Sequence, residues 1–131
     1  FTDVAQSMGL DAMGSFRSVL PVDINRDGVE DLIVTQASQR TLVYVSDGCT
    51  AQNWVEIHAP IGSRVRVESA SGIQTDWSRI DRGYESTAWI PLHFGLGPDA
   101  VIDAITVDYP DGHSQRLEGP IDARRVIRFI R

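Results

Sequence analysis

The residues best placed to do chemistry form one loop, Asp23-Ile24-Asn25-Arg26-Asp27-Gly28-Val29-Glu30-Asp31. Oxygen-bearing side chains occupy loop positions one, three, five and nine, and glycine occupies position six. A hard cation such as Ca²⁺ takes six to eight oxygen ligands, and a loop that coils around it presents alternate residues inward. The spacing therefore predicts a Ca²⁺ site formed by Asp23, Asn25, Asp27, Asp31 and the carbonyl group of Val29.

The loop is not an EF-hand. An EF-hand requires a bidentate glutamate at position twelve and an exiting helix, whereas position twelve is Val34 and Asp31 opens the β-rich run Leu-Ile-Val-Thr. We therefore expect a nine-residue calcium loop that leads into a strand. The alternative is a hairpin of ordinary Asx turns, in which the aspartates cap backbone amides without a metal.

Three aromatic residues, Trp77, Tyr84 and Trp89, form a second candidate site. If they are exposed together they could stack on sugar rings or on a protein partner, and if they point inward they belong to the core.

The histidines His58, His93 and His113 lack metal-ligand spacing, and no nucleophile and base motif is visible. A carboxylate-dependent hydrolase is the remote alternative. The single cysteine, Cys49, is predicted to be a small buried hydrophobe.

Composition excludes several functional classes. The chain has 131 residues and a formal net charge of −6, with 12 basic residues, all arginine, against 13 Asp and 5 Glu. A pI near 4.9 argues against nucleic acid as the main partner. No apolar run is long enough for membrane insertion. The first residue is Phe1 rather than methionine, so we expect a processed or trimmed product.

The elements that must position these residues are short strands. Apolar alternation and turn residues predict strands at 32–35, 41–45, 54–58, 64–69, 73–77, 86–94, 104–109, 114–118 and 125–130. Short helical turns are expected at 4–8 and 98–101, and the polar stretch 46–53 is the expected boundary. The fold class is therefore all-β: an antiparallel β-sandwich or barrel-like domain with an N-terminal hairpin that carries the calcium loop.

Two resemblances add to this prediction. Phe1-Thr2-Asp3-Val4-Ala5, Gly9-Leu10 and the stretch from Val22 to Val34 resemble an FG-GAP/VCBS repeat, over roughly residues 1–48. The resemblance implies one blade of a β-propeller and assigns Ca²⁺ to the loop residues named above. A lone blade cannot bury both faces, so it must pack on the rest of the chain, pair with another copy as a homo-oligomer, or belong to a longer protein.

The second resemblance, over residues 53–130, is to the ASPIC/UnbV domain. It rests on five short segments in a fixed order: Asn53-Trp54-Val55-Glu56-Ile57, Ile61-Gly62-Ser63-Arg64-Val65-Arg66-Val67, Gly83-Tyr84-Glu85-Ser86, Leu92-His93-Phe94-Gly95-Leu96-Gly97 and Ile105-Thr106-Val107-Asp108-Tyr109-Pro110-Asp111-Gly112. This family typically follows FG-GAP repeats in secreted proteins and is associated with binding or adhesion.

The combined prediction is a non-catalytic, calcium-binding module outside the cytoplasm, extracellular or periplasmic. It would comprise an FG-GAP-like blade, residues 1–48, and an ASPIC/UnbV-like β domain, residues 53–131, packed as one unit. Its expected partner is a protein or a glycan. A Ca²⁺-assisted carbohydrate-binding module that uses the exposed aromatics is the alternative.

Overall fold

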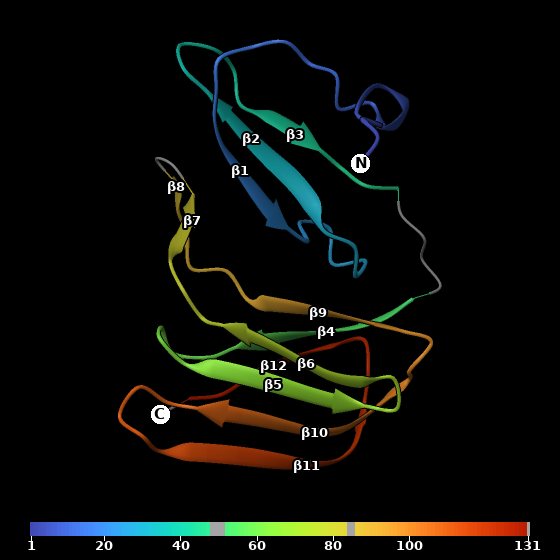
Figure 1. Ribbon diagram of the computed structural model, residues 1–131, viewed down its shortest axis with the longest axis vertical. Helices are drawn as coiled ribbons and strands as arrows, with labels where there is room; N and C mark the ends of the chain where they lie inside the picture. The colour runs from blue at the N-terminus through green and yellow to red at the C-terminus, as the bar shows by residue number, and fades with distance from the viewer. Residues whose placement is uncertain (48–51, 84–85, 131) are drawn as a thin grey trace.

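The computed structural model describes residues 1–47, 52–83 and 86–130, and it is built from strands (Figure 1). A 3-10 turn, η1 (Gln6–Met8), precedes β1 (Phe16–Val22), β2 (Asp31–Gln36), β3 (Leu42–Tyr44), β4 (Asn53–His58), β5 (Arg64–Ser69) and β6 (Gly72–Trp77). The remaining strands are β7 (Asp81–Gly83), β8 (Ser86–Thr87), β9 (Leu92–Gly97), β10 (Val101–Asp108), β11 (Ser114–Asp122) and β12 (Arg125–Arg128). No helix in the described part of the chain is long and apolar enough to cross a membrane.

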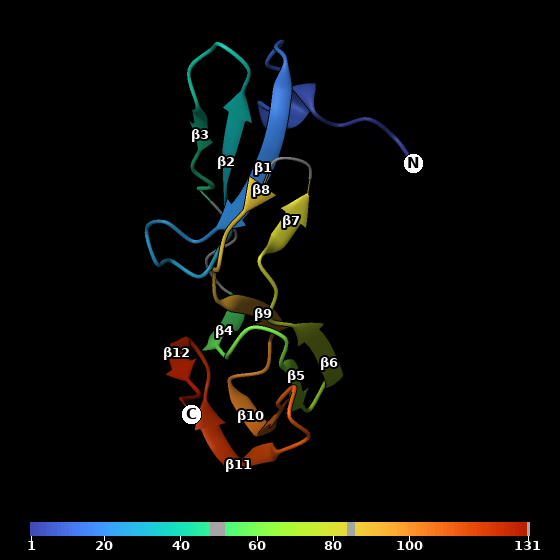
Figure 2. The same cartoon turned by 90° about the vertical axis from the view of Figure 1, so that its left-hand side faces the viewer.

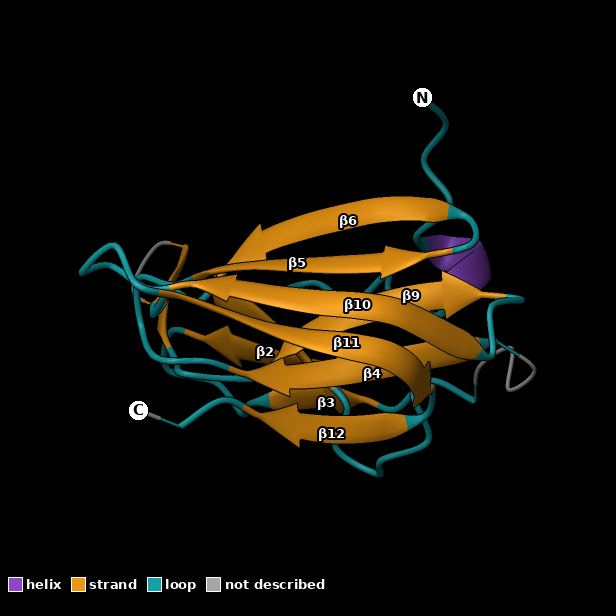
Figure 3. Cartoon of the chain, turned by 90° about the horizontal axis from the view of Figure 1, so that it is seen from below, coloured by secondary structure: helices purple, strands orange, loops and turns teal. Residues whose placement is uncertain are grey.

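Two sheets form a β-sandwich around the main core. A four-stranded sheet of order β11-β10-β5-β6 packs on a three-stranded sheet of order β12-β4-β9 (Figure 3). Alternate residues of β4, β5 and β10 point inward, and Val55, Ile57, Val65, Ile105 and Val107 have no exposed surface. This period of two is what buries one face of each strand and leaves the other face free.

The last strand gives the sandwich its one parallel pairing. β12 lies parallel to β4, with Arg125 opposite Val55 and Arg128 opposite His58, whereas β4 and β9 run antiparallel. The three-stranded sheet is therefore mixed. It is not closed onto the four-stranded sheet as a barrel, which corrects the barrel-like part of the predicted fold class.

An N-terminal antiparallel sheet of order β1-β2-β3 lies outside the sandwich. Figures 1 and 2 place it on the side of the β12-β4-β9 sheet that faces away from the sandwich core. The short β7-β8 ribbon lies beside β1. Val34 is the only large apolar side chain of this sheet that is buried, while Val19, Val43 and Phe16 are 47%, 55% and 43% exposed.

The structure agrees with most of the predicted strands and corrects three details. β1 was not predicted, because its segment Phe-Arg-Ser-Val-Leu-Pro-Val includes a proline and lacks clean alternation. The predicted strand 86–94 is two strands, β8 and β9, separated around Pro91, which cannot donate to a ladder. The turn expected at 98–101 contains no helix, since Val101 already begins β10. The expected boundary at 46–53 lies partly outside the described residues. The prediction for Cys49 lies wholly outside them.

Candidate functional site

The predicted calcium loop connects β1 to β2, as the sequence indicates. Val22 and Asp31 are paired across the two strands, so the loop closes at that pair. Arg26 and Gly28 adopt positive φ angles of 63° and 91°, which fold the backbone tightly back on itself. The sequence signal for this loop was the glycine at position six together with the alternating oxygen donors.

The loop coils around the carboxylate of Asp23. One Asp23 oxygen accepts hydrogen bonds from the backbone N–H groups of Arg26 and Asp27, at 2.7 and 3.2 Å, and the other accepts one from Gly28 at 2.8 Å. Asp27 accepts bonds from the Val29 backbone at 2.8 Å and from the Asn25 side-chain amide at 2.8 Å. The side chains at loop positions one, three and five therefore point toward the inside of the loop, where they accept hydrogen bonds from its backbone amides.

Asp31 differs from the other loop carboxylates in its burial. Its side chain is only 1% exposed. One oxygen accepts the Ile24 backbone N–H at 2.9 Å and the other accepts the Ser46 backbone N–H at 2.8 Å. The carboxylate of Asp31 therefore links the start of the loop to the segment that follows β3, because it accepts a backbone hydrogen bond from each.

The donor set fits a hard cation in its chemistry, since carboxylates, an amide oxygen and a carbonyl group are the ligands that Ca²⁺ prefers. In the described residues, however, no three Asp, Glu, His or Cys side chains lie close enough together to hold a metal. The oxygens of Asp23, Asp27 and Asp31 instead accept N–H groups, which is the arrangement of the Asx-turn alternative. If Ca²⁺ is bound, these residues and Val29 would hold it, and the ion would neutralise their charge.

The loop rests on the sandwich through Gly28 and Trp54. A Cβ atom added at Gly28 would collide with the indole ring of Trp54 on β4. The same indole stacks on the imidazole of His93 on β9, with ring centroids 6.0 Å apart and planes 17° apart. The Nδ1 atom of His93 is buried without a hydrogen-bond partner and lies 3.9 Å from Glu56. Glycine is thus required here for close approach as well as for φ.

A cleft of about 640 Å³ lies between the loop and the β12-β4-β9 sheet. Its charged lining comes from Asp23 and Arg26 on the loop and from Glu56, His58 and Arg128 on the sheet. Burial, and then the charge of Asp23, raises the pKa of Glu56. Burial, and then the charge of Arg128, lowers the pKa of His58. The cleft therefore holds two groups, Glu56 and His58, whose charged forms are disfavoured in the folded protein.

These cleft residues were not identified as a site from the sequence. Trp54, Glu56 and His58 alternate along β4, and this spacing places them on the outer face of the sheet. That signal was present in the sequence. What it lacked was the position of the β1–β2 loop over the same face, which is a tertiary contact.

The two described aromatics of the second candidate site point outward. Trp77 at the end of β6 is 50% exposed and Trp89 before β9 is 60% exposed. The ring of Trp89 meets that of His58 edge-to-face, with centroids 6.5 Å apart. Tyr84 lies outside the described residues. The inward alternative is therefore wrong for Trp77 and Trp89.

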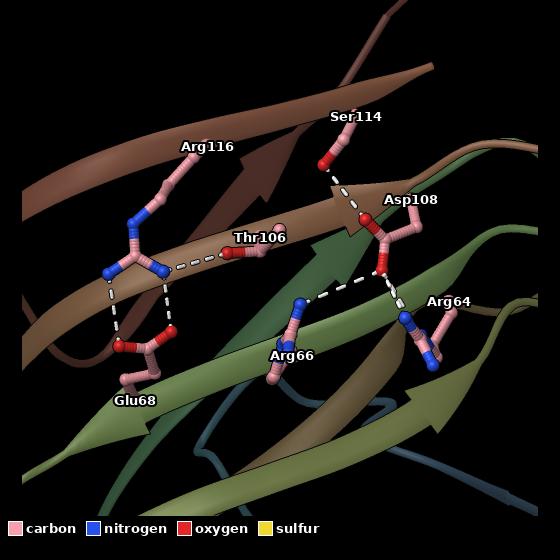
Figure 4. Close-up of polar contacts among 7 residues, drawn as sticks. All are labelled: Arg64, Arg66, Glu68, Thr106, Asp108, Ser114 and Arg116. Atoms are coloured by element: carbon pink, nitrogen blue, oxygen red, sulfur yellow. Dashed lines mark hydrogen bonds and ion pairs between the residues drawn. The ribbon is translucent and has the colours of Figure 1, made fainter. Parts of the chain in front are cut away.

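The outer face of the four-stranded sheet carries a network of ion pairs (Figure 4). Arg116 on β11 reaches across to Glu68 on β5, with one contact of 3.0 Å, and also donates to Thr106 on β10 at 3.0 Å. Asp108 accepts bonds from Arg64 at 2.7 Å and Ser114 at 2.8 Å. The network covers β10, where Thr106 is only 6% exposed. These arginines are paired with acids, so this face is not a free cationic surface.

The fold defines an all-β protein in which a two-sheet sandwich carries a third sheet and a docked acidic loop. The family model described as ASPIC and UnbV matches residues 56–128. The chain belongs to the ASPIC/UnbV family, and the match covers the sandwich. No FG-GAP or VCBS repeat is detected in the chain. No curated protein matches the chain closely enough to be reported as a relative.

Proposed function

We propose that this protein is a non-catalytic, calcium-binding β module that acts outside the cytoplasm and binds a protein or glycan partner. In this proposal the N-terminal sheet is an FG-GAP-like blade, and its loop holds Ca²⁺ through Asp23, Asn25, Asp27, Asp31 and the Val29 carbonyl group. The metal part is supported by the chemistry and spacing of the oxygen donors, which lie in one short loop closed by the Val22–Asp31 pair between β1 and β2. Bound Ca²⁺ would contribute folding stability, because ligands that bind only the native state stabilise it.

The binding part of the proposal rests on exposed aromatic surface. Tryptophan is enriched in protein interfaces and is often among the few residues that carry most of the binding energy. Trp77 and Trp89 are both exposed. Tryptophan faces also stack on sugar rings, so the same observation supports a carbohydrate-binding module as the second candidate.

A thermal melt with Ca²⁺ and with chelator tests the metal part. At a free Ca²⁺ concentration a hundredfold above the Kd, we expect about 2.7 kcal/mol of added stability. The substitution Asp27→Ala should remove this shift. The substitution Asp11→Ala, at an exposed aspartate outside the loop, is the matched control and should keep it. An unchanged melting temperature in the native protein would refute calcium binding.

A glycan array and a pull-down from secreted proteins test the binding part, each compared between the native protein and the double variant Trp77→Ala, Trp89→Ala. Loss of a specific signal in the variant would support the proposal. Equal signals from both proteins, or none from either, would argue against these aromatics as the binding surface.

A further inference from the structure

An apolar groove of about 600 Å³ lies at the end of the sandwich where β4 and β12 finish. Its exposed walls are Ile61, Trp89 and Ile130, which are 51%, 60% and 86% exposed. They come from three separate segments: the turn after β4, the link before β9, and the residues after β12. We call this the Trp89 groove. Its volume is in the range of pockets that hold small ligands or a few residues of a peptide.

The groove is held in place by backbone bonds and packing. The Phe129 N–H donates to the His58 carbonyl group at 2.9 Å, which extends the β4–β12 pairing into the groove. The hydroxyl of Ser78 donates to the carbonyl group of Ala59 at 2.9 Å. Trp89 itself packs edge-to-face on the imidazole of His58. A preformed wall of this kind lowers the entropic cost of binding.

The charge of the groove is opposite to that of the chain as a whole. Among the residues that the structure describes, Arg128 and His58 are the only ionisable side chains that line it and no carboxylate does, although the chain carries a net charge of −6. Among the described residues no ion pair to Arg128 is seen. Burial and then the charge of Arg128 lower the pKa of His58, which disfavours the charged form of its imidazole. A single guanidinium beside apolar walls favours an anion attached to an apolar group.

We propose that the Trp89 groove binds an extended peptide segment in which a large apolar side chain stands beside a carboxylate. The apolar side chain would pack on Trp89, Ile61 and Ile130, and the carboxylate would accept hydrogen bonds from Arg128. This inference rests on the proposed binding function and names its partner class. A sugar fits less well, because the described lining offers its several hydroxyl groups only two polar side chains, Arg128 and His58.

The sheet edge next to the groove suits an extended segment. β12 is the outermost strand of the β12-β4-β9 sheet, so no described strand of this sheet pairs with its free side. An incoming peptide could add to such an edge through main-chain hydrogen bonds and place alternate side chains into an adjoining pocket. The groove begins where β12 ends, at Arg128.

The test uses two synthetic acetylated tetrapeptides that end in phenylalanine, one with a free carboxylate and one with a carboxamide. Binding to the full chain is followed by isotope-edited NMR shifts and by calorimetry. We expect the free acid to bind about tenfold more tightly than the amide, the usual worth of one charge-assisted pair. The substitution Arg128→Gln should abolish the difference. Equal affinities of the two peptides for the native protein would overturn the proposal without any variant.

Variants locate the site. Trp89→Ala should weaken the binding of both peptides. Trp77→Ala changes a tryptophan that is also at least half exposed but does not line the groove, and it should weaken the binding of neither. Fatty acids and a glycan array are the competing arms. If only glycans bind, in a manner that depends on Trp89, the peptide proposal is wrong while the proposed binding function stands. If only fatty acids bind, both the peptide proposal and the proposed protein or glycan partner are wrong. If peptides, fatty acids and glycans all fail, the proposed binding function fails with it.

Discussion

The N-terminal sheet and the sandwich are both made of short, mainly antiparallel strands, but they are stabilised in different ways. The sandwich encloses a cluster of buried apolar side chains drawn from both of its sheets, among them Ile57, Leu92 and Ile105. In the N-terminal sheet the buried residues are Val34 and Asp31, and only Val34 is apolar. Its loop is organised by hydrogen bonds to Asp23 and Asp31 and by contact with Trp54.

The difference in buried apolar area indicates which of the two regions depends on contacts outside itself for its stability. Burial of apolar area is the main source of stability, so a sheet with little of it depends on what it docks against. For the N-terminal sheet these supports are the sandwich surface and, in our proposal, a bound cation. The sandwich has its own core and offers its exposed end for binding.

The largest expected effect comes from the sandwich core. Ile57→Ala removes a side chain with no exposed surface and should lower the free energy of unfolding by about 3–4 kcal/mol, since a cavity is left behind. Val34→Ala in the N-terminal sheet should cost less, about 1–2 kcal/mol. Urea denaturation measures both. Equal losses would show that the N-terminal sheet is as well packed as the sandwich, and the contrast between the two regions would be lost.

The substitution Gly28→Ala tests the contact between the β1–β2 loop and the sandwich. The added methyl group meets the indole of Trp54, and the φ of 91° is unfavourable for alanine, so we expect a loss of about 2–3 kcal/mol. Gly112→Ala is the matched control, because Gly112 has a φ of 86° and nothing within 4 Å of an added Cβ. It should lose only about 1 kcal/mol. The excess loss at Gly28 measures the contact with Trp54, and similar losses would mean that the loop does not rest on it.

A smaller effect is expected from pH. The pKa of His58 is lowered in the folded protein, first by burial and then by Arg128, so the folded state binds a proton less readily than the unfolded chain. Stability should therefore fall as pH drops below about 6.5, the ordinary histidine value. Melting temperatures between pH 8 and pH 5 should decline less steeply for His58→Gln. Parallel pH profiles for the two proteins would contradict this assignment.

The smallest effect should be that of Val43→Ser on β3. Val43 is 55% exposed, and surface substitutions of this kind usually change stability by no more than about 0.5 kcal/mol. Chemical denaturation at two protein concentrations provides the measurement. A loss above about 1 kcal/mol that grows with concentration would reveal that another copy of the chain covers this face.

Much of the sandwich could be predicted from the sequence. Alternation in Arg64-Val65-Arg66-Val67 and the Pro110-Asp111-Gly112 turn are local signals, and both hairpins they predicted are present. The strand β1 was missed because Pro21 and the charged Arg17 weaken its pattern, while its pairing with β2 depends on residues on the far side of the loop. The parallel β4–β12 pair has no local signal at all.

The candidate sites were predictable to different degrees. The oxygen donors of the loop are adjacent in sequence, so their shared position between β1 and β2 followed from spacing. Whether Trp77 and Trp89 face inward or outward did not follow, because each is compatible with both faces of its segment. The Trp89 groove combines Ile61, Trp89 and Arg128 from distant parts of the chain, and only the tertiary structure brings them together.

The parallel pairing of β12 with β4 has a consequence for the order of folding during synthesis. Val55 pairs opposite Arg125, so 125 − 55 = 70 residues separate a position on β4 from its partner. At roughly 5–20 residues per second, translation of that interval takes about 4–14 s. Throughout it one edge of β4 has no strand to bond with, and an unpaired edge is prone to intermolecular pairing. The nascent sandwich therefore keeps an unpaired, aggregation-prone strand edge until its last strand emerges.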